Sequence, residues 1–257
     1  MPVACCRELR GVFCDIDDTL TSGGRLPAAA FAALWRLREA GLSVVPVTGR
    51  PAGWCDHLAR MWPVDAVVGE NGAFYFAMGP TGMVRRWVQD EATREASRRK
   101  LDDLAARILA VVPEVRVAAD QFCRASDLAI DFCEDVPAAG LEAIDRVLAI
   151  FAEAGASAKV SSIHVNGWFG DFDKLTTVRL VSREVLGVDL QAERERFLFV
   201  GDSPNDDPAF AFFPVSAGVA NIQGFLPRMS HPPAYVARRE GGEGFAEIVD
   251  AILGSRS

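Results

Sequence analysis

The chain has 257 residues, half of them hydrophobic, and a formal net charge of −8. This length is near the size at which single cores stop growing, so more than one domain is expected. The acidic balance disfavours nucleic acid and anionic membranes as partners, although an anionic small molecule can bind where cations gather locally. No stretch approaches the roughly 18 apolar residues of a membrane helix.

The six cysteines form no Cys-x-x-Cys pair, and the first residues lack the apolar core of a secretory signal. These features predict reduced thiols and a cytoplasmic protein. We expect a monomer or a homodimer.

The first element in chain order is a short apolar strand, Val12–Cys14, that stops at a carboxylate. Asp15, Asp17 and Asp18 follow it closely, and a divalent cation makes such crowding of like charges tolerable. Ligands of open parallel sheets bind beyond the carboxyl ends of strands, so a site is expected here. The alternative is an acidic loop that only caps the next helix.

Helices and strands then alternate: helix 27–40, strand 42–47, helix 51–61 and strand 66–68. The strand over 42–47 ends at Thr48, Gly49 and Arg50, again a reactive group at a strand end. This alternation predicts an α/β fold with a doubly wound parallel sheet.

After Gly72 the pattern changes to a hairpin over 73–88, helix 91–111, strands 115–118 and 128–132, helix 141–154 and a strand over 162–166. This order predicts an α+β module inserted into the first domain. We place the insert at 75–170, which leaves a discontinuous core of 1–74 and 171–257.

The α/β pattern resumes with helix 173–186, strand 197–200, helix 207–212, strands 215–219 and 235–237, and helix 245–253. The strand over 197–200 is followed by Asp202, Asn205 and Asp206. Strand ends of a parallel sheet meet at one edge, so these acids are expected to lie near Asp15.

The set suggests phosphoryl transfer. Asp15 can attack phosphorus and form an aspartyl phosphate, and Asp17 can protonate the leaving oxygen and later deprotonate a water. Thr48 and neighbouring amides can hold the phosphoryl oxygens, and Lys174 can neutralise their charge. Asp202 and Asp206 suit Mg²⁺. Each residue has a structural alternative, such as a turn hydroxyl, a solvated lysine or a helix N-cap.

The stretches Asp15–Leu20, Thr48–Arg50, Lys174 and Gly201–Asp206 resemble the four motifs of the haloacid dehalogenase-like phosphohydrolases. The insert resembles the type-two cap of the Cof-type branch, which includes sugar-phosphate phosphatases such as sucrose-phosphate phosphatase. The resemblance implies a Rossmann-like core, an aspartyl-phosphate mechanism and Mg²⁺. It also implies metal ligation by Asp15, the Asp17 carbonyl and Asp202, with Asp206 in support, and a role for Asn205 in ordering phosphate or Lys174.

Two strands of the insert alternate in polarity. Their apolar residues are expected to pack on the insert's two helices, while Asp127, Asp131, Ser162, His164 and Asn166 face the other way. We expect this polar face to roof the site, with bulk solvent as the alternative. The candidate substrate contacts are Gly49, Arg50, Asn205, Arg124, Asp131 and His164.

These observations favour a Mg²⁺-dependent phosphatase whose partner is a small phosphorylated metabolite, a sugar or polyol phosphate. The alternatives are a phosphomutase of the same fold and a non-enzymatic phospho-acceptor switch. The switch is disfavoured because a receiver domain carries no large cap and has no need of Asp17.

Overall fold

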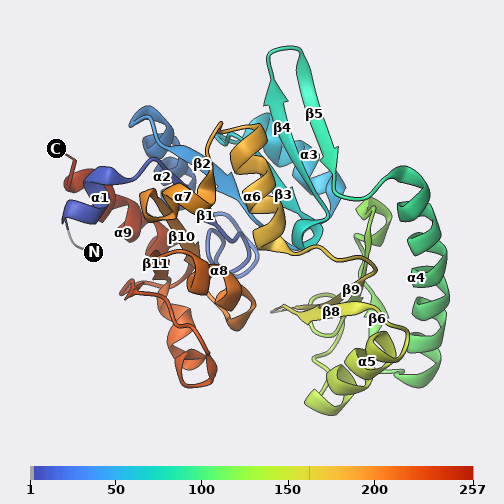
Figure 1. Ribbon diagram of the computed structural model, residues 1–257. Coiled ribbons are helices and arrows are strands. Elements are labelled where there is room, and N and C mark those ends of the chain that lie inside the picture. The colour runs from blue at the N-terminus through green and yellow to red at the C-terminus, as the bar shows by residue number, and fades with distance from the viewer. Residues whose placement is uncertain (1–2, 162, 257) are drawn as a thin grey trace.

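A parallel sheet in the order β12-β11-β10-β1-β2 forms the centre of the computed structural model, which describes residues 3–161 and 163–256 (Figure 1). Its strands are β1 (Gly11–Cys14), β2 (Ser43–Pro46), β10 (Phe197–Gly201), β11 (Val215–Gly218) and β12 (Tyr235–Val236). In the register, Phe13 lies between Phe199 and Val45. The loops that follow these strands therefore emerge along one edge.

Helices cover both faces of this sheet because neighbouring residues of its strands point to opposite sides. Val12 and Cys14 pack in one core cluster, whereas Phe13 packs in another. The first cluster is covered by α2 (Ala28–Glu39), α3 (Ala52–Met61) and α9 (Gly241–Gly254), with α1 (Val3–Glu8) beside α9. The second is covered by α6 (Lys174–Glu184) and α8 (Asp207–Phe212), and α7 (Leu190–Glu193) lies next to α6. The predicted doubly wound α/β class is confirmed.

The hairpin of β4 (Phe74–Gly79) and β5 (Gly82–Trp87) extends the core. β4 pairs antiparallel with β3 (Val67–Gly69), and β3 is joined to the chain after β2 by a parallel bridge between Val47 and Val68. A domain limit at residue 75 would cut through this paired sheet. A limit near residue 88 keeps it whole, and the domain limits stay a prediction.

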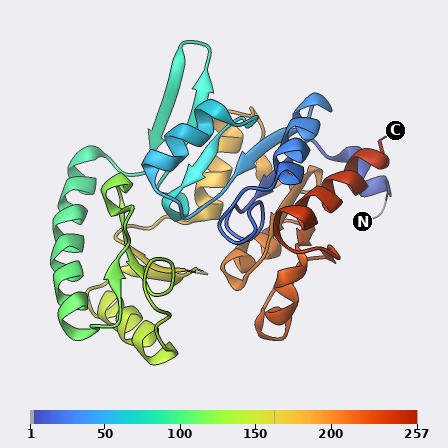
Figure 2. The same ribbon diagram turned by 180° about the vertical axis from the view of Figure 1, so that it is seen from behind.

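A second module lies beside the core and is joined to it by two connecting segments (Figures 1 and 2). We refer to it as the cap. Its antiparallel sheet has the order β6-β7-β9-β8. The strands and helices are β6 (Arg116–Val117), β7 (Asp127–Asp131), β8 (Ser157–Val160), β9 (His164–Trp168), α4 (Glu91–Val111) and α5 (Leu141–Glu153).

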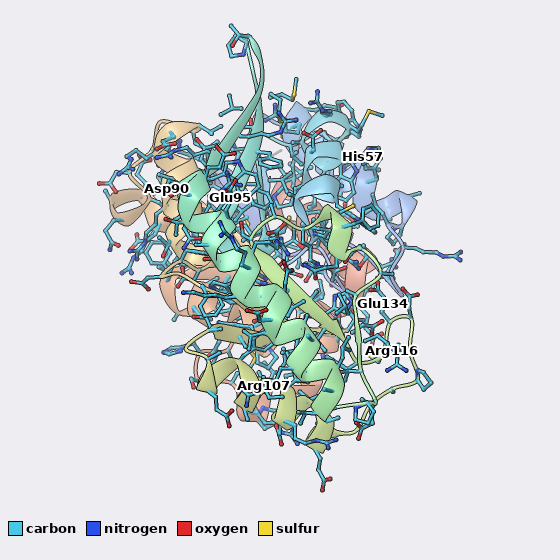
Figure 3. The ribbon with its side chains drawn as sticks, turned by 90° about the vertical axis from the view of Figure 1, so that its right-hand side faces the viewer. His57, Asp90, Glu95, Arg107, Arg116 and Glu134 are labelled. Carbon is cyan, nitrogen blue, oxygen red and sulfur yellow. The ribbon has the colours of Figure 1, made fainter. Side chains whose placement is uncertain are left out.

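The apolar side of the cap sheet packs on both cap helices. Leu128, Ile130 and Val165 share a buried cluster with residues of α4 and α5. Figure 3 shows α4 along the outside of the cap, with Asp90 at its start and Arg107 towards its other end. Asp90 caps the helix, because its carboxylate accepts the N–H of Thr93. The other side of the sheet is thereby left for the polar residues.

Several elements differ from the sequence prediction. β8 and the short helices α1 and α7 were not predicted, because each is too short to show a clear period. The strand predicted over 162–166 is observed as β9 over 164–168. Ser162, one of the predicted polar residues, lies outside the described residues.

Gly167 permits the packing of β9 on α5. A Cβ atom at this position would lie 2.2 Å from the ring of Phe151, which is completely buried. We expect Gly167→Ala to lower the free energy of unfolding by about 1–3 kcal/mol through overpacking, measured by urea denaturation. Gly140→Ala is the control, since its Cβ would meet open space, and should cost only about 0.5 kcal/mol. Equal effects of the two changes would contradict this account.

Candidate active site

The loops after β1, β2, β3 and β10, the start of α6 and the polar face of the cap line one pocket of about 510 Å³, partly open to solvent. The predicted residues in its wall are Asp15, Asp17, Gly49, Arg50, Arg124, His164, Lys174, Asp202 and Asn205. Thr48, Asp131 and Asp206 are not in that wall. The geometry brings residues far apart in sequence together, while their chemical roles stay predictions.

Lys174 begins α6, and its ammonium lies between two carboxylates. Nζ is 2.7 Å from Oδ1 of Asp15 and 3.3 Å from Oδ1 of Asp206. Burial acts to lower the pKa of Lys174, but the two carboxylates outweigh burial and raise this pKa above its ordinary value. The lysine is therefore a fixed positive charge beside Asp15.

Asp15 and Asp202 are buried carboxylates with too little positive charge around them. Burial raises the pKa of Asp15 to about 7, with Lys174 opposing and Asp206 assisting. Burial raises the pKa of Asp202 to about 9, with further contributions from Asp206 and Asp15. A divalent cation between these groups would relieve both the desolvation and the repulsion.

The donor set at this point fits Mg²⁺. Among the described residues no three Asp, Glu, His or Cys side chains form a ready metal cluster. Mg²⁺ needs few carboxylates because it keeps several of its waters. Asp15, Asp202 and the carbonyl of Asp17 would suffice.

Asp206 holds neighbouring groups in place and is not itself one of these three candidate metal ligands. Its Oδ1 lies beside Lys174 Nζ, and its Oδ2 accepts the N–H of Asp202 at 3.1 Å. Both oxygens are thus engaged, and they orient the lysine and the backbone that carries Asp202.

Thr48 lies beneath the pocket. Its side chain is fully buried, and Oγ1 accepts the N–H of Arg50 at 3.0 Å. This contact closes the turn that presents Gly49 and Arg50 to the pocket. The hydroxyl hydrogen is still available for donation.

Arg50 holds Asp17 and reaches the cap. Its Nε and Nη2 lie 2.8–3.1 Å from the Asp17 carboxylate, a bidentate pair. Its Nη1 is 3.4 Å from Oε1 of Glu134 and 4.0 Å from Asp120, both cap residues. The guanidinium also lies over the ring of Trp54, 4.7 Å from its centroid. Arg50 therefore links the predicted acid–base residue to the position of the cap.

Arg124 is locked in place by its neighbours. Nη1 lies 3.1 Å from Asp127 and donates to the Gly49 carbonyl at 3.0 Å, while Nε is 3.2 Å from Asp120. Asn166 donates to the same Asp127 carboxylate at 3.0 Å. The arginine therefore docks the cap on the turn after β2, which leaves it little freedom to bind a substrate anion.

Asp131 has a structural task instead of the predicted substrate contact. Its carboxylate accepts the backbone N–H groups of Cys133, Glu134 and Asp135 at 2.8–2.9 Å. The alternation that placed it on the polar face was correct, but it did not show that the next turn would occupy the carboxylate. Ile163, predicted to pack with the apolar face, instead lines the pocket just before β9.

His164 faces the pocket from β9. Burial, followed by the charge of Arg124, lowers the pKa of His164, so the ring is neutral at pH 7. Its Nε2 is 2.9 Å from Oε2 of Glu134, yet the angle is too poor for a hydrogen bond. The ring can therefore offer a neutral donor or acceptor to a ligand.

Two asparagines at the site were not predicted. Asn71 lines the pocket after β3, with a positive φ of 56° that asparagine adopts more readily than most residues. Asn221 donates to the Asp18 carbonyl at 3.0 Å and to Asp202 at 3.3 Å. Both follow core strands, β3 and β11, so the rule that ligands bind at strand ends could have found them.

Glu70 ties the cap to the core from a fully buried position. Its carboxylate accepts the N–H groups of Ala52 in the core and of Ala125 and Ser126 in the cap, at 2.6–2.9 Å. Burial raises the pKa of Glu70 to about 7, Asp127 adds to this, and the backbone donors only partly oppose it.

A family profile described as haloacid dehalogenase-like hydrolase matches residues 12–84. A phosphoglycolate phosphatase of the archaeon Methanothrix thermoacetophila is 29% identical over 244 residues, which cover 94% of this chain and 96% of that protein.

Solved structures share the fold over nearly the whole chain. Protein 0175 of Thermoplasma acidophilum has a TM-score of 0.73 at 19% identity, covering 95% of this chain and 98% of its own. The sucrose-phosphatase of Synechocystis sp. PCC6803, solved with sucrose and phosphate, has a TM-score of 0.66 at 17% identity, covering 97% and 98%. A HAD/COF-like hydrolase from Plasmodium vivax has a TM-score of 0.72 at 16% identity, covering 98% and 99%.

Residues 12–84 therefore match the haloacid dehalogenase-like hydrolase family, and the whole chain shares its fold with solved structures that include a HAD/COF-like hydrolase. The matched family is one of hydrolases, and the matched curated relative is a phosphatase. These matches agree with the predicted family and enzyme class. In the described part of the chain no helix has the length and apolarity needed to cross a membrane.

The buried Glu70 predicts a pH dependence of stability. Its pKa rises from an ordinary 4.5 to about 7 on folding, so the folded protein holds this proton more tightly than the unfolded chain. The free energy of unfolding should therefore fall as pH rises from about 4.5 to 7, by about 1–3 kcal/mol from this group.

Urea denaturation at pH 5 and pH 7 isolates the effect by comparing wild type with Glu70→Gln, which cannot titrate. The stability of wild type relative to the variant should be lower at pH 7 than at pH 5. Glu142→Gln, on the exposed surface of α5, should follow wild type at both pH values. Parallel pH curves for wild type and Glu70→Gln would contradict the assignment.

Proposed function

We propose that the protein is a Mg²⁺-dependent phosphatase that hydrolyses a small phosphorylated metabolite through an aspartyl-phosphate intermediate. The observation that carries the proposal is the position of Asp15 at the end of β1, with Lys174 Nζ at 2.7 Å in a pocket shared with Asp17 and Asp202. A pocket with a few convergent polar side chains suits a small molecule.

In the first step the Asp15 carboxylate attacks phosphorus, and the bond from phosphorus to the ester oxygen breaks. Asp17 gives its proton to that oxygen, which leaves as an alcohol. Lys174 holds Asp15 in position and neutralises charge on the phosphoryl oxygens. In the second step water attacks phosphorus, Asp17 takes the proton, and inorganic phosphate is released as the bond to Asp15 breaks.

Asp17 must leave Arg50 before it can serve as the acid. Arg50 donates to both carboxylate oxygens of Asp17, so neither oxygen is free to meet the leaving group. We infer that Arg50 turns towards the phosphoryl group when substrate binds, which frees Asp17 to face the leaving oxygen. Since Arg50 also contacts Glu134 and Asp120, this movement is coupled to the position of the cap.

Asp15, the Asp17 carbonyl and Asp202 would hold the Mg²⁺, with Asp206 orienting Asp202. When bound, the ion supplies positive charge to the phosphoryl oxygens and neutralises the crowded carboxylates. This account agrees with the raised pKa values of Asp15 and Asp202 in its absence.

Hydrolysis is preferred over transfer to a second sugar because the matched curated relative is a phosphatase. The sequence favoured a sugar or polyol phosphate as substrate. A second candidate, a short phosphorylated acid, is favoured by the archaeal relative, a phosphoglycolate phosphatase that covers 94% of this chain. A screen of phosphorylated metabolites that measures free phosphate would choose between them.

Replacing the nucleophile should abolish turnover. We expect Asp15→Asn to hydrolyse p-nitrophenyl phosphate below detection while it stays folded, because an amide is a poor nucleophile. Asp17→Asn should lose about 10²–10⁴-fold in kcat with the same ester. Asp18→Asn is the control, since this third acid has no assigned role and asparagine tolerates its φ of 56°. Substantial activity in Asp15→Asn would refute the mechanism.

Removing divalent metal should stop the reaction. Excess EDTA is expected to eliminate phosphatase activity, and Mg²⁺ should restore it, with Mn²⁺ or Co²⁺ as substitutes. Ca²⁺ should restore little, because it prefers more ligands and a looser geometry. Thermal denaturation gives a second readout, in which Mg²⁺ should stabilise wild type but not Asp202→Asn. Full activity in EDTA would contradict the proposed metal.

A further inference from the structure

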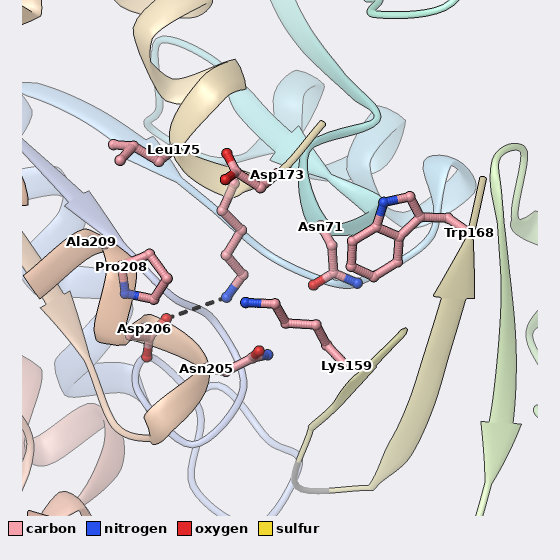
Figure 4. Close-up of a pocket in the computed structure, with 10 residues that line it drawn as sticks. Asn71, Lys159, Trp168, Asp173, Leu175, Asn205, Asp206, Pro208 and Ala209 are labelled. Carbon is pink, nitrogen blue, oxygen red and sulfur yellow. Dashed lines mark hydrogen bonds and ion pairs between the residues drawn. The ribbon is translucent and has the colours of Figure 1, made fainter. Parts of the chain in front are cut away.

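A second pocket of about 380 Å³ adjoins the proposed site, and a cap lysine enters it (Figure 4). Lys159 lies on β8 opposite Asn166 of β9, so it belongs to the polar face of the cap sheet. In Figure 4 its ammonium end extends into the pocket near Asn205, and Lys174 lines the same pocket. Lys174, Asn71 and Asn205 line both pockets, which are therefore adjacent.

Among the described residues, the other cationic side chains that line the two pockets form ion pairs with carboxylates, whereas Lys159 does not. Among the described residues that line the two pockets, Lys174 pairs with Asp15, Arg50 with Asp17 and Arg124 with Asp127. No ion pair of Lys159 is found in the described part of the chain. The Lys159 ammonium is therefore available to an anion that enters the pocket.

Lys159 and the nucleophile Asp15 lie on opposite sides of the site, one in the cap and the other in the core. Asp15 approaches phosphorus from the core, and an in-line displacement sends the leaving group away from it, towards the cap. Lys159 comes from the cap side, whereas the phosphoryl oxygens are served by Lys174, the metal ligands and the loops of the core. The anion that suits Lys159 is therefore carried by the leaving group.

The surroundings favour a carboxylate over a second phosphate. A single ammonium with the amide of Asn71 nearby matches one negative charge, while a phosphate dianion calls for more donors. Leu175, Pro208 and Ala209 form an apolar wall that suits a short carbon chain. The pocket is small, so few atoms can separate the two anions.

We propose that Lys159 is a specificity-determining residue that binds a carboxylate on the leaving group, so that the preferred substrate is a short phosphorylated hydroxy acid. This inference rests on the proposed phosphatase function and chooses between its two substrate classes. It predicts that the charge of Lys159 acts on one class of substrate and leaves the chemistry of phosphoryl transfer unchanged.

The test compares 2-phosphoglycolate with 2-hydroxyethyl phosphate, which replaces the carboxylate by an alcohol at similar size. Lys159→Met should lower kcat/KM for 2-phosphoglycolate about 10–100-fold, mainly through KM, as expected for loss of a charged hydrogen bond. Hydrolysis of 2-hydroxyethyl phosphate and p-nitrophenyl phosphate should change less than about 3-fold. Lys159→Arg should recover part of the loss.

Lys100→Met is the matched control, because Lys100 is the other cap lysine and lies exposed over the ring of Phe169. It should leave all three substrates unaffected. Ethane-1,2-diyl bisphosphate is a further probe, and it should be a poorer substrate than 2-phosphoglycolate. The carboxylate assignment would be overturned in favour of phosphate if the bisphosphate reacted faster than 2-phosphoglycolate and lost as much activity in Lys159→Met.

Equal losses on all substrates in Lys159→Met would show that the lysine acts on the phosphoryl group or on folding, and no loss would show that it has no part. Either result overturns the inference. If the wild-type enzyme hydrolyses p-nitrophenyl phosphate but does not prefer 2-phosphoglycolate over 2-hydroxyethyl phosphate, only the inference about Lys159 is contradicted. Wild type that hydrolyses none of these esters with Mg²⁺ defeats the proposed function, and the inference with it.

Discussion

The buried ammonium of Lys174 between Asp15 and Asp206 is the contact on which the site depends. A buried charge is tolerated only with well-placed partners, so the start of α6, the end of β1 and the loop after β10 must meet at one point. The parallel register of β1 and β10 provides that meeting place. Burial, together with the neighbouring carboxylates, nevertheless raises the pKa values of Asp15 and Asp202, because one lysine offsets only part of this cost. The same constraint that assembles the core site therefore crowds the carboxylates at which we propose a divalent cation.

The sequence predicted this part of the molecule well, for a physical reason. A buried parallel strand is a short apolar run, and its end is marked where the run stops at a polar residue. Asp15, Thr48 and Asp202 each follow such a run, and strand ends of one sheet share an edge. Asn221 follows β11 in the same way and could have been included.

The cap was predicted less well. A polarity that alternates along a strand shows on which face of the sheet a side chain lies, but it does not show which group that side chain contacts. Asp131 and Arg124 were expected to meet the substrate, but one closes a turn and the other docks the cap. Lys159 was missed because β8 is short and its polarity pattern weak. Glu70 was missed because its three backbone partners come from segments distant in sequence. Such partners exist only once the cap has met the core.

The contacts between cap and core are of two kinds, and this difference affects how a substrate would be selected. Glu70 and Arg124 bind backbone groups across the interface, so they hold the cap near α3 whatever the ligand. Arg50 and Lys159 instead present charge to the pockets, and both can exchange their present surroundings for a substrate anion. A substrate that satisfies both cations would gain binding energy only when the cap is closed over it, since the two lie on opposite sides of the interface. Closure and recognition of the leaving group would then be one event, which would place specificity in the cap while the chemistry stays in the core.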